Sequence, residues 1–359
     1  MVTAYLDTTL GTCYFSDYRS PCHGYQTMTR NLTPNEAVER YLKERKPEVS
    51  QATWQNHSYT LQRFVEFCTD EDIENINSLD GFSVHEFKID RREDDISEQT
   101  LYNNLCVLRV FLQWCESLGL VKESISEDMI LPEAKGVRHE TIAPERVSDI
   151  LGYLDDFEYA TLRHALFALL WDTGIRLGAA RALDVDDYYS DEAYAALHHR
   201  PATGTPLKND EGGEREVNLH RWVCDILDDY IKHNREDTSD EYDREPLFAS
   251  TRGRTTKGNL RMHINALTRP CYYTDKCPHD RDISDCEATT FNHAQRCPSS
   301  VTPHPIRRSA ITYWLNQGHP KELVSDRMNV SKKVLDKHYD ERTEEEKREL
   351  RRQAFEMSS

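Results

Sequence analysis

The sequence has no long hydrophobic run. No stretch of about 18 apolar residues occurs in the 359-residue chain, so no membrane-spanning helix is expected. The opening segment, MVTAYLDTTLGTCYFSD, also lacks the basic and then apolar segments of a signal peptide. We therefore expect a cytoplasmic protein with no membrane partner.

Positive charge is scarce. The chain has 45 lysines and arginines against 63 acidic residues, and its net charge is -18. Taken alone, this balance argues against a nucleic-acid partner, because phosphate binding depends on lysine and arginine. The same excess of carboxylates is typical of proteins from a very salty cytoplasm, where the screening length falls to about 3 Å and only local contacts count. Composition therefore leaves a nucleic-acid partner open.

Helical spacing of apolar residues divides the chain into two domains. Residues 1–32 show no sustained period and are interpreted as a tail. Residues 33–120 predict a small helical bundle. Residues 121–142 lose the period and predict a linker, and helical spacing then resumes over 143–359.

Local signals fix some of the element boundaries. Thr33 and Glu36 form a capping box that opens the first helix. Two strand-like segments, 193–200 and 214–219, flank a polar turn in the second domain. The expected fold is therefore mainly α with a small antiparallel β-sheet.

Five polar residues stand out in four separated segments of the second domain. Arg176 follows a Thr-Gly break between two helices, in TGIRLG. Lys208 lies in the turn between the two strands, in TGTPLKNDEGG. His304 and Arg307, in HPIRRS, are three residues apart and therefore share one face of a helix. Tyr339 follows near the end of a short helix, in VLDKHYD.

These residue types suit transfer of a phosphodiester. Arginine forks can hold two phosphate oxygens and neutralise the charge of the transition state. A tyrosine can attack phosphorus and form a phosphotyrosyl intermediate when a partner such as histidine removes its proton. A lysine on a hairpin can protonate the leaving 5′-oxygen. Such a set needs no metal, because the arginines supply the positive charge.

Taken singly, each residue also has an ordinary structural explanation. Arg176 could form a salt bridge at a helix start, and Lys208 could be a solvated turn residue. Tyr339 could be a core aromatic. The order and spacing of the whole set are what favour the catalytic interpretation.

The blocks TGIRLGAARALDVDDY, TGTPLKNDEGGEREV, HPIRRSAITYWLNQG and MNVSKKVLDKHYD, in this order, resemble the tyrosine recombinase (phage integrase) family. The acidic composition and a cysteine-rich insertion are most similar to the integrases of haloarchaea and their viruses. The resemblance implies that 33–120 is a SAM-like core-binding domain and that 143–359 is an α+β catalytic domain. It also implies that the two domains form a C-shaped clamp around DNA.

The resemblance assigns a role to each of the five residues. Arg176 and Arg307 would clamp the phosphate, and His304 would be the general acid/base. Lys208 would be the general acid on the hairpin and Tyr339 the nucleophile. The implied protein is a site-specific recombinase or integrase with no catalytic cofactor. Its partners would be a double-stranded attachment site and, at the synapse, three further copies of itself in a homotetramer.

One position departs from the family pattern. The family usually places a second histidine or a tryptophan nine residues before the nucleophile, and Val330 occupies that position here. Asn329 lies beside it and could donate a hydrogen bond to the phosphate. The sixth phosphate-site position is therefore assigned to Val330 or Asn329.

One segment reverses the overall charge. No acidic residue occurs from 246 through 274, whereas Arg252, Arg254, Lys257 and Arg261 lie within it. We interpret these four as DNA-backbone contacts that precede a helix in the major groove. The alternative is a solvated flank of a helix.

Four of the ten cysteines crowd into the insertion at 271–297. Because disulfides are not expected in a cytosolic protein, four thiolates in a segment with few apolar residues suggest a structural Zn²⁺ site. His279 and His293 are alternative ligands. The spacing lacks the usual C-x-x-C, so a reduced insertion with free thiols is the alternative. The predicted ligands are Cys271, Cys277, Cys286 and Cys297.

Two other functions remain open from the sequence. A type IB topoisomerase-like relaxase would use the same nucleophile and arginines but reseal the same strand. A catalytically silent, zinc-containing DNA-binding regulator would retain the fold. Val330, at a position where the family usually has histidine or tryptophan, is consistent with this alternative.

Overall fold

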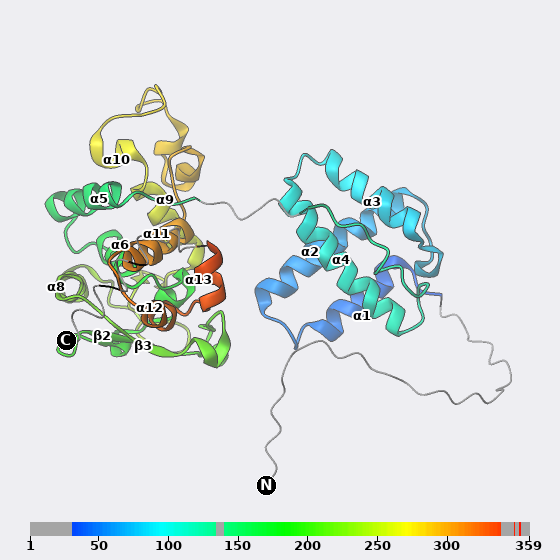
Figure 1. Ribbon diagram of the computed structural model, residues 1–359, viewed down its shortest axis with the longest axis horizontal. Coiled ribbons are helices and arrows are strands. Elements are labelled where there is room, and N and C mark those ends of the chain that lie inside the picture. Colours follow the sequence, from blue (N-terminus) through cyan, green and yellow to red (C-terminus); the bar gives the residue numbers. More distant parts are fainter. Residues whose placement is uncertain (1–30, 134–139, 339–347, 349–351, 353–359) are drawn as a thin grey trace, which may run out of the picture. The chain divides into compact units, whose positions relative to one another are not determined.

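The computed structural model describes residues 31–133, 140–338, 348 and 352 of the chain. The chain divides into two compact units, Met1–Val137 and Arg138–Ser359 (Figure 1). Both are built mainly from helices, and the strands form small antiparallel sheets, so the predicted fold class is confirmed. Within the described residues, no helix is long and apolar enough to cross a membrane.

Four helices make up the first unit, each with a polar cap at its start. Thr33 accepts a hydrogen bond from the N–H of Glu36 at 3.2 Å, and the Glu36 carboxylate accepts from the N–H of Thr33 at 3.0 Å, so the predicted capping box is present. Ser50, Asp80 and Ser97 cap the other three helices. The helices are α1 (Pro34–Arg45), α2 (Gln51–Asp70), α3 (Gly81–Glu93) and α4 (Glu98–Ser117).

Aromatic rings from three of these helices fill the first core. The Phe64 ring of α2 meets the Phe87 ring of α3 edge to face, with centroids 5.3 Å apart. Phe111 of α4 lies 6.2 Å from Phe64 on another side. All three rings are fully buried, which gives the bundle a packed centre.

The segment expected to be a linker, 121–142, belongs largely to the two cores. Val121, Ile125 and Met129 are buried with the first unit, in a segment of turns that follows α4. Ile142 is buried in the second unit, where its N–H donates to Ser309 Oγ at 2.8 Å. Residues at both ends of the segment predicted as a linker therefore contribute to the cores of the two units.

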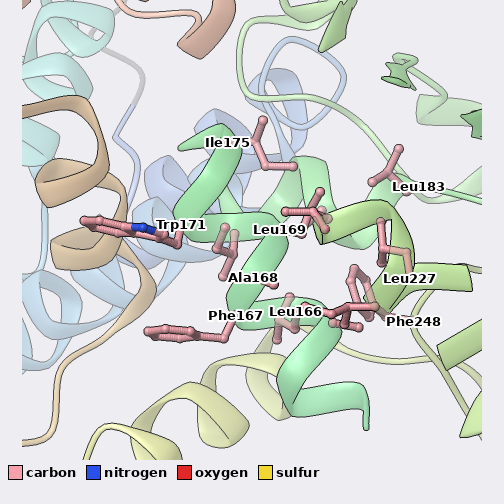
Figure 2. Packing of buried hydrophobic residues seen from close by; sticks show 14 of the residues in the cluster. Leu166, Phe167, Ala168, Leu169, Trp171, Ile175, Leu183, Leu227 and Phe248 are labelled. Atoms are coloured by element: carbon pink, nitrogen blue, oxygen red, sulfur yellow. The ribbon is translucent and has the colours of Figure 1, made fainter. Parts of the chain in front are cut away.

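The second unit is built around α6 (Leu162–Thr173), which is buried on all sides. Figure 2 shows Phe167 and Trp171 pointing to one side of this helix, while Leu166 lies toward Leu227 and Phe248 on the other. The remaining helices are α5 (Pro144–Phe157), α7 (Leu177–Ala182), α8 (Arg221–Asp229), α9 (Lys257–Leu267), α10 (Pro270–Thr274), α11 (Pro303–Asn316), α12 (Lys321–Met328) and α13 (Lys332–His338).

A three-stranded antiparallel sheet lies beside these helices. The two predicted strands form β2 (Tyr194–Leu197) and β3 (Arg215–Asn218), which pair from Tyr194 with Asn218 to Leu197 with Arg215. The strand β1 (Tyr188–Tyr189), which the sequence pattern did not reveal, extends the sheet on the β2 side. A second, two-stranded sheet pairs β4 (Ala249–Ser250) with β5 (Gly253–Arg254).

Candidate active site

A glycine break between α6 and α7 positions Arg176. Gly174 ends α6 in the left-handed conformation, with φ 59° and ψ 18°, and its N–H donates to the Leu170 carbonyl at 3.0 Å. A Cβ at this position would lie 2.9 Å from Sδ and Cε of Met328, so a larger residue would also collide with α12. Arg176 follows as the N-cap of α7, in extended backbone.

Arg307 ties this break to the end of α12. Its side chain is buried within α11, and Nη1 donates to the carbonyl of Gly174. Nη2 donates to the carbonyl of Asn329 at 3.4 Å. One guanidinium therefore links the loop before Arg176 to the turn between α12 and α13.

His304 lies in the same positively charged environment. Desolvation lowers the pKa of His304 below its usual value of 6.5. The positive charges of Arg308, Arg307 and Arg176 lower this pKa further. The imidazole is therefore uncharged at neutral pH and can accept a proton. Arg176, His304 and Arg307, predicted from separate segments, are thus brought together.

Lys208 lies exposed on the β2–β3 hairpin, which Asn329 holds against the same site. The side-chain amide of Asn209 donates to Oδ1 of Asn329, and Nδ2 of Asn329 donates to the Gly212 carbonyl at 2.7 Å. Asn329 adopts a left-handed backbone with φ 47°, which asparagine tolerates better than most residues. The hairpin that carries Lys208 is therefore bound to the turn that also accepts from Arg307.

The two residues predicted for the sixth position have different surroundings. Val330 is buried in an apolar cluster of α11, α12 and α13, and its side chain offers no polar group to a phosphate. Asn329 uses its side chain to hold the hairpin. The rest of the cluster is Ile311, Leu315, Val324, Met328 and Leu335.

Tyr339, the predicted nucleophile, lies outside the described residues. The described residues of helix α13, Lys332–His338, are the last before it in the chain. The five-residue catalytic set therefore remains a prediction at this position.

Arg215 is a basic residue near the site that the sequence pattern did not single out. It lies on β3, where Nε donates to the Arg327 carbonyl and Nη1 to the Gly213 carbonyl, both at 2.8 Å. Burial lowers the pKa of Arg215 to about 10, and the neighbouring charge of Arg176 contributes. In the sequence, only its position after the hairpin lysine distinguished Arg215 as a residue near the site. That signal is weak, because arginines beside strands are equally common on protein surfaces.

A buried carboxylate joins the helices that surround the site. Asp172, near the end of α6, accepts from the N–H of His220 at 3.2 Å and from Nη2 of Arg327 at 3.4 Å. Its carbonyl accepts from Nε1 of Trp314 at 3.1 Å, and Trp314 stacks on the His220 ring. Helices α6, α8, α11 and α12 are therefore joined two residues before Gly174.

The predicted DNA contacts separate into exposed and structural residues. Arg252 and Arg261 are exposed, as a backbone contact requires. The Arg254 side chain is only 4% exposed and pairs with Asp184 and, at 2.8 Å, with Asp240. The prediction for Arg254 is therefore corrected, because two buried carboxylates occupy its guanidinium.

The cysteine-rich insertion does not assemble the predicted zinc ligands. Among the described residues, which include all four cysteines, no group of three or more His, Cys, Asp or Glu side chains could hold a metal ion. Protein contacts order the segment instead. Buried Arg269 donates to the Ala288 carbonyl at 2.7 Å, and His279 hydrogen-bonds Ser299 Oγ at 2.9 Å. The assignment of Cys271, Cys277, Cys286 and Cys297 as ligands is thus corrected.

Comparisons with known proteins agree with this architecture. Residues 38–118 match the N-terminal SAM-like domain of phage integrases. The structure is similar to that of the Tn1549 transposon integrase in complex with a circular intermediate DNA. The TM-score is 0.66 at 16% identity, over 89% of this chain and 99% of that one. The chain therefore has the fold of the tyrosine recombinase integrases, with an N-terminal SAM-like domain.

Proteins with similar sequences support the same family. The tyrosine recombinase XerC of Halalkalibacterium halodurans is 23% identical over 295 residues, which are 80% of this chain and 85% of that protein. XerC of Escherichia coli O157:H7 is 23% identical over 150 residues, 41% of this chain, so the chain spans about half the length of that relative. Together with the SAM-like match, these relatives support the tyrosine recombinase family for this chain.

Proposed function

We propose that this chain is a site-specific DNA recombinase that cleaves and rejoins strands through a 3′-phosphotyrosyl intermediate. The observation that carries the proposal is the convergence of Arg176, His304 and Arg307. The hairpin of Lys208 is bound to the same place through Asn329.

The arginines would bind the scissile phosphate. Arg307 is held by two backbone carbonyls, so its orientation is set before DNA arrives. Arg176 is the N-cap of α7, and its half-buried side chain belongs to the same cluster of positive charges as His304. Groups fixed in advance stabilise developing charge without the cost of reorganisation.

The charge state of each group would determine whether it accepts or donates a proton. Uncharged His304 accepts the hydroxyl proton of Tyr339 as the tyrosine oxygen bonds to phosphorus. The bond from phosphorus to the 5′-oxygen breaks, and the ammonium of Lys208 donates a proton to that oxygen. In the second step, the 5′-hydroxyl of a partner strand attacks phosphorus and gives its proton to the neutral Lys208 amine. The bond from phosphorus to the Tyr339 oxygen breaks, and His304 returns its proton to that oxygen. No oxidant or cofactor enters this balance.

The finer assignments belong to the same proposal. Strand exchange joins two duplexes and uses four cleavage events, so the working assembly is a homotetramer on two attachment sites. We place the protein in the cytoplasm, where its DNA substrate lies. The net charge of -18 favours an origin in a halophilic archaeon or its viruses.

Trapping of a covalent complex tests the proposal. The protein is incubated with a pool of nicked duplexes of randomised sequence, in which the cleaved fragment diffuses away, and adducts are resolved under denaturing conditions. We expect an adduct with the natural protein and none with Tyr339→Phe. Tyr242→Phe is the matched control, because Tyr242 is an exposed tyrosine and its loss should leave the adduct unchanged.

Two outcomes separate the alternatives. A natural protein that binds DNA but forms no adduct would be the silent regulator. An adduct accompanied by relaxation of supercoiled DNA, with no joining of two different duplexes, would indicate the topoisomerase-like relaxase. Joined products carrying ends from both duplexes are the result that the proposal predicts.

A further inference from the structure

The side chain of Lys257 lies directly on the helix that begins at Arg176. Gly178 is in the first turn of this helix, two residues after Arg176. A Cβ built on Gly178 would lie 3.1 Å from Cε and 3.2 Å from Nζ of Lys257. The absence of a side chain at Gly178 therefore lets the ammonium approach α7 more closely than a Cβ would allow.

Hydrogen bonds fix the start of α9 against α7. Nε of Arg181 donates to the Thr255 carbonyl at 3.1 Å, and the Thr256 side chain caps α9 by accepting from the N–H of Asn259 at 3.1 Å. Lys257, the first residue of α9, consequently leaves the backbone at a fixed point beside α7. Its approach to Gly178 follows from this anchoring.

The charges around Lys257 leave its ammonium without a counter-ion in the described protein. Among the described residues, no carboxylate or carbonyl forms an ion pair or hydrogen bond with Nζ. Partial desolvation lowers the pKa of Lys257, and the positive charges of Arg181 and Lys208 lower it further. A partly desolvated ammonium that faces two cations is stabilised when an anion binds beside it.

We propose that Lys257 is a further phosphate-binding residue of the active site. Its ammonium binds a non-bridging oxygen of the DNA backbone at or next to the phosphate that Arg176 holds, and Gly178 is the small residue that makes room for it. The proposal rests on the proposed function, and it assigns Lys257 to the cleavage site rather than to the DNA-backbone contacts predicted for Arg252 and Arg261. Lys208 keeps its role as the acid.

A glycine substitution can displace the ammonium without changing any charge. Gly178→Ala places a methyl group 3.1 Å from Cε and 3.2 Å from Nζ, close enough to push the end of the Lys257 side chain away from α7, and it suits helical backbone. Gly258→Ala is the matched control. It adds the same methyl group beside Lys257, where the nearest atom is Thr256 Oγ1 at an ordinary 3.8 Å. Lys257→Gln removes the charge itself.

The first measurement is the salt dependence of binding to a short duplex of arbitrary sequence. Loss of one phosphate contact lowers the slope of log K against log salt by about 0.9. We expect this decrease for Lys257→Gln and for Gly178→Ala, no change for Gly258→Ala, and no additional decrease in the Gly178→Ala, Lys257→Gln double variant. The second measurement is the rate of adduct formation, which should fall about 10-fold or more in the same variants.

The outcomes distinguish this inference from the proposed function. An unchanged slope for Lys257→Gln, or a Gly178→Ala protein that behaves like Gly258→Ala, overturns the role of Lys257 even if the natural protein forms its adduct. A lowered slope in a protein that never forms an adduct would contradict the recombinase assignment and retain the phosphate contact. Should Gly178→Ala fail to fold by circular dichroism, the slope of Lys257→Gln alone decides.

Discussion

Replacement of Gly174 by alanine tests how the fold positions the arginine pair. Gly174 has φ 59°, where an L-residue costs about 1–2 kcal/mol. The new methyl group would lie 2.9 Å from Sδ and Cε of Met328, which is fully buried and must be repacked at about 1–3 kcal/mol. Alanine also lowers the conformational entropy of the unfolded chain relative to glycine, which stabilises the folded state by about 0.4–1 kcal/mol. The free energy of unfolding of the second unit should therefore fall by about 1–5 kcal/mol.

Hydrogen exchange of the α6 amides measures this loss in the second unit directly, because the slowest amides open with the global free energy. Gly152→Ala in α5 is the control. Its methyl group meets nothing within 4 Å, and it should stabilise the helix by up to about 1 kcal/mol. In a Met328→Ala background, the backbone cost less the unfolded-chain contribution should remain, about 0–1.6 kcal/mol. A Gly174→Ala protein as stable as Gly152→Ala would refute the reasoning.

Three further predictions concern the pH response, the charge network and the support behind the site. Adduct formation should rise with pH through an inflection below 6.5, because the depressed pKa of His304 leaves the imidazole uncharged above it, and His304→Gln should abolish this inflection in a single-turnover pH profile. Arg254→Ala should lower the urea-derived free energy of unfolding by about 1–3 kcal/mol, because Asp240 loses its arginine partner while Asp184 keeps Arg200 and Arg244. By contrast, Arg252→Ala should change the free energy of unfolding by no more than about 0.5 kcal/mol and should weaken DNA binding. If Arg252→Ala and Arg254→Ala changed the free energy of unfolding equally, the assignment of Arg254 to the fold and of Arg252 to DNA would be contradicted. Asp172→Ala should cost about 3 kcal/mol in the same unfolding assay and slow adduct formation, whereas Asp172→Asn, which keeps one acceptor, should cost less.

Local sequence signals were sufficient where a structural feature depends on neighbouring residues. The caps at Thr33, Ser50 and Ser97 are short-range hydrogen bonds, so the residues that make them lie within one helical turn. The glycine break before Arg176 is local in the same sense, because a left-handed residue favours glycine wherever the helix ends. Alternating apolar residues likewise located β2 and β3.

Long-range pairing could not be predicted in this way. The bonds of Arg307 to the Gly174 carbonyl and of Asn329 to the hairpin join residues more than a hundred positions apart, and no local pattern specifies them. Arg254 had the composition of a DNA contact, but the burial of Asp184 and Asp240 around it decides its role. The apparent zinc ligands illustrate the same limit, because the number of thiols in a segment does not determine where its backbone directs them.

The chemical identity of the covalent link tests the central claim most directly. The trapped adduct is digested with a protease and a nuclease, and mass spectrometry then identifies the modified residue and the nucleotide end attached to it. We predict a single modified peptide in which Tyr339 carries a 3′-phosphate, with a free 5′-hydroxyl on the released strand. Attachment through a 5′-phosphate, or to any residue other than Tyr339, would contradict the account.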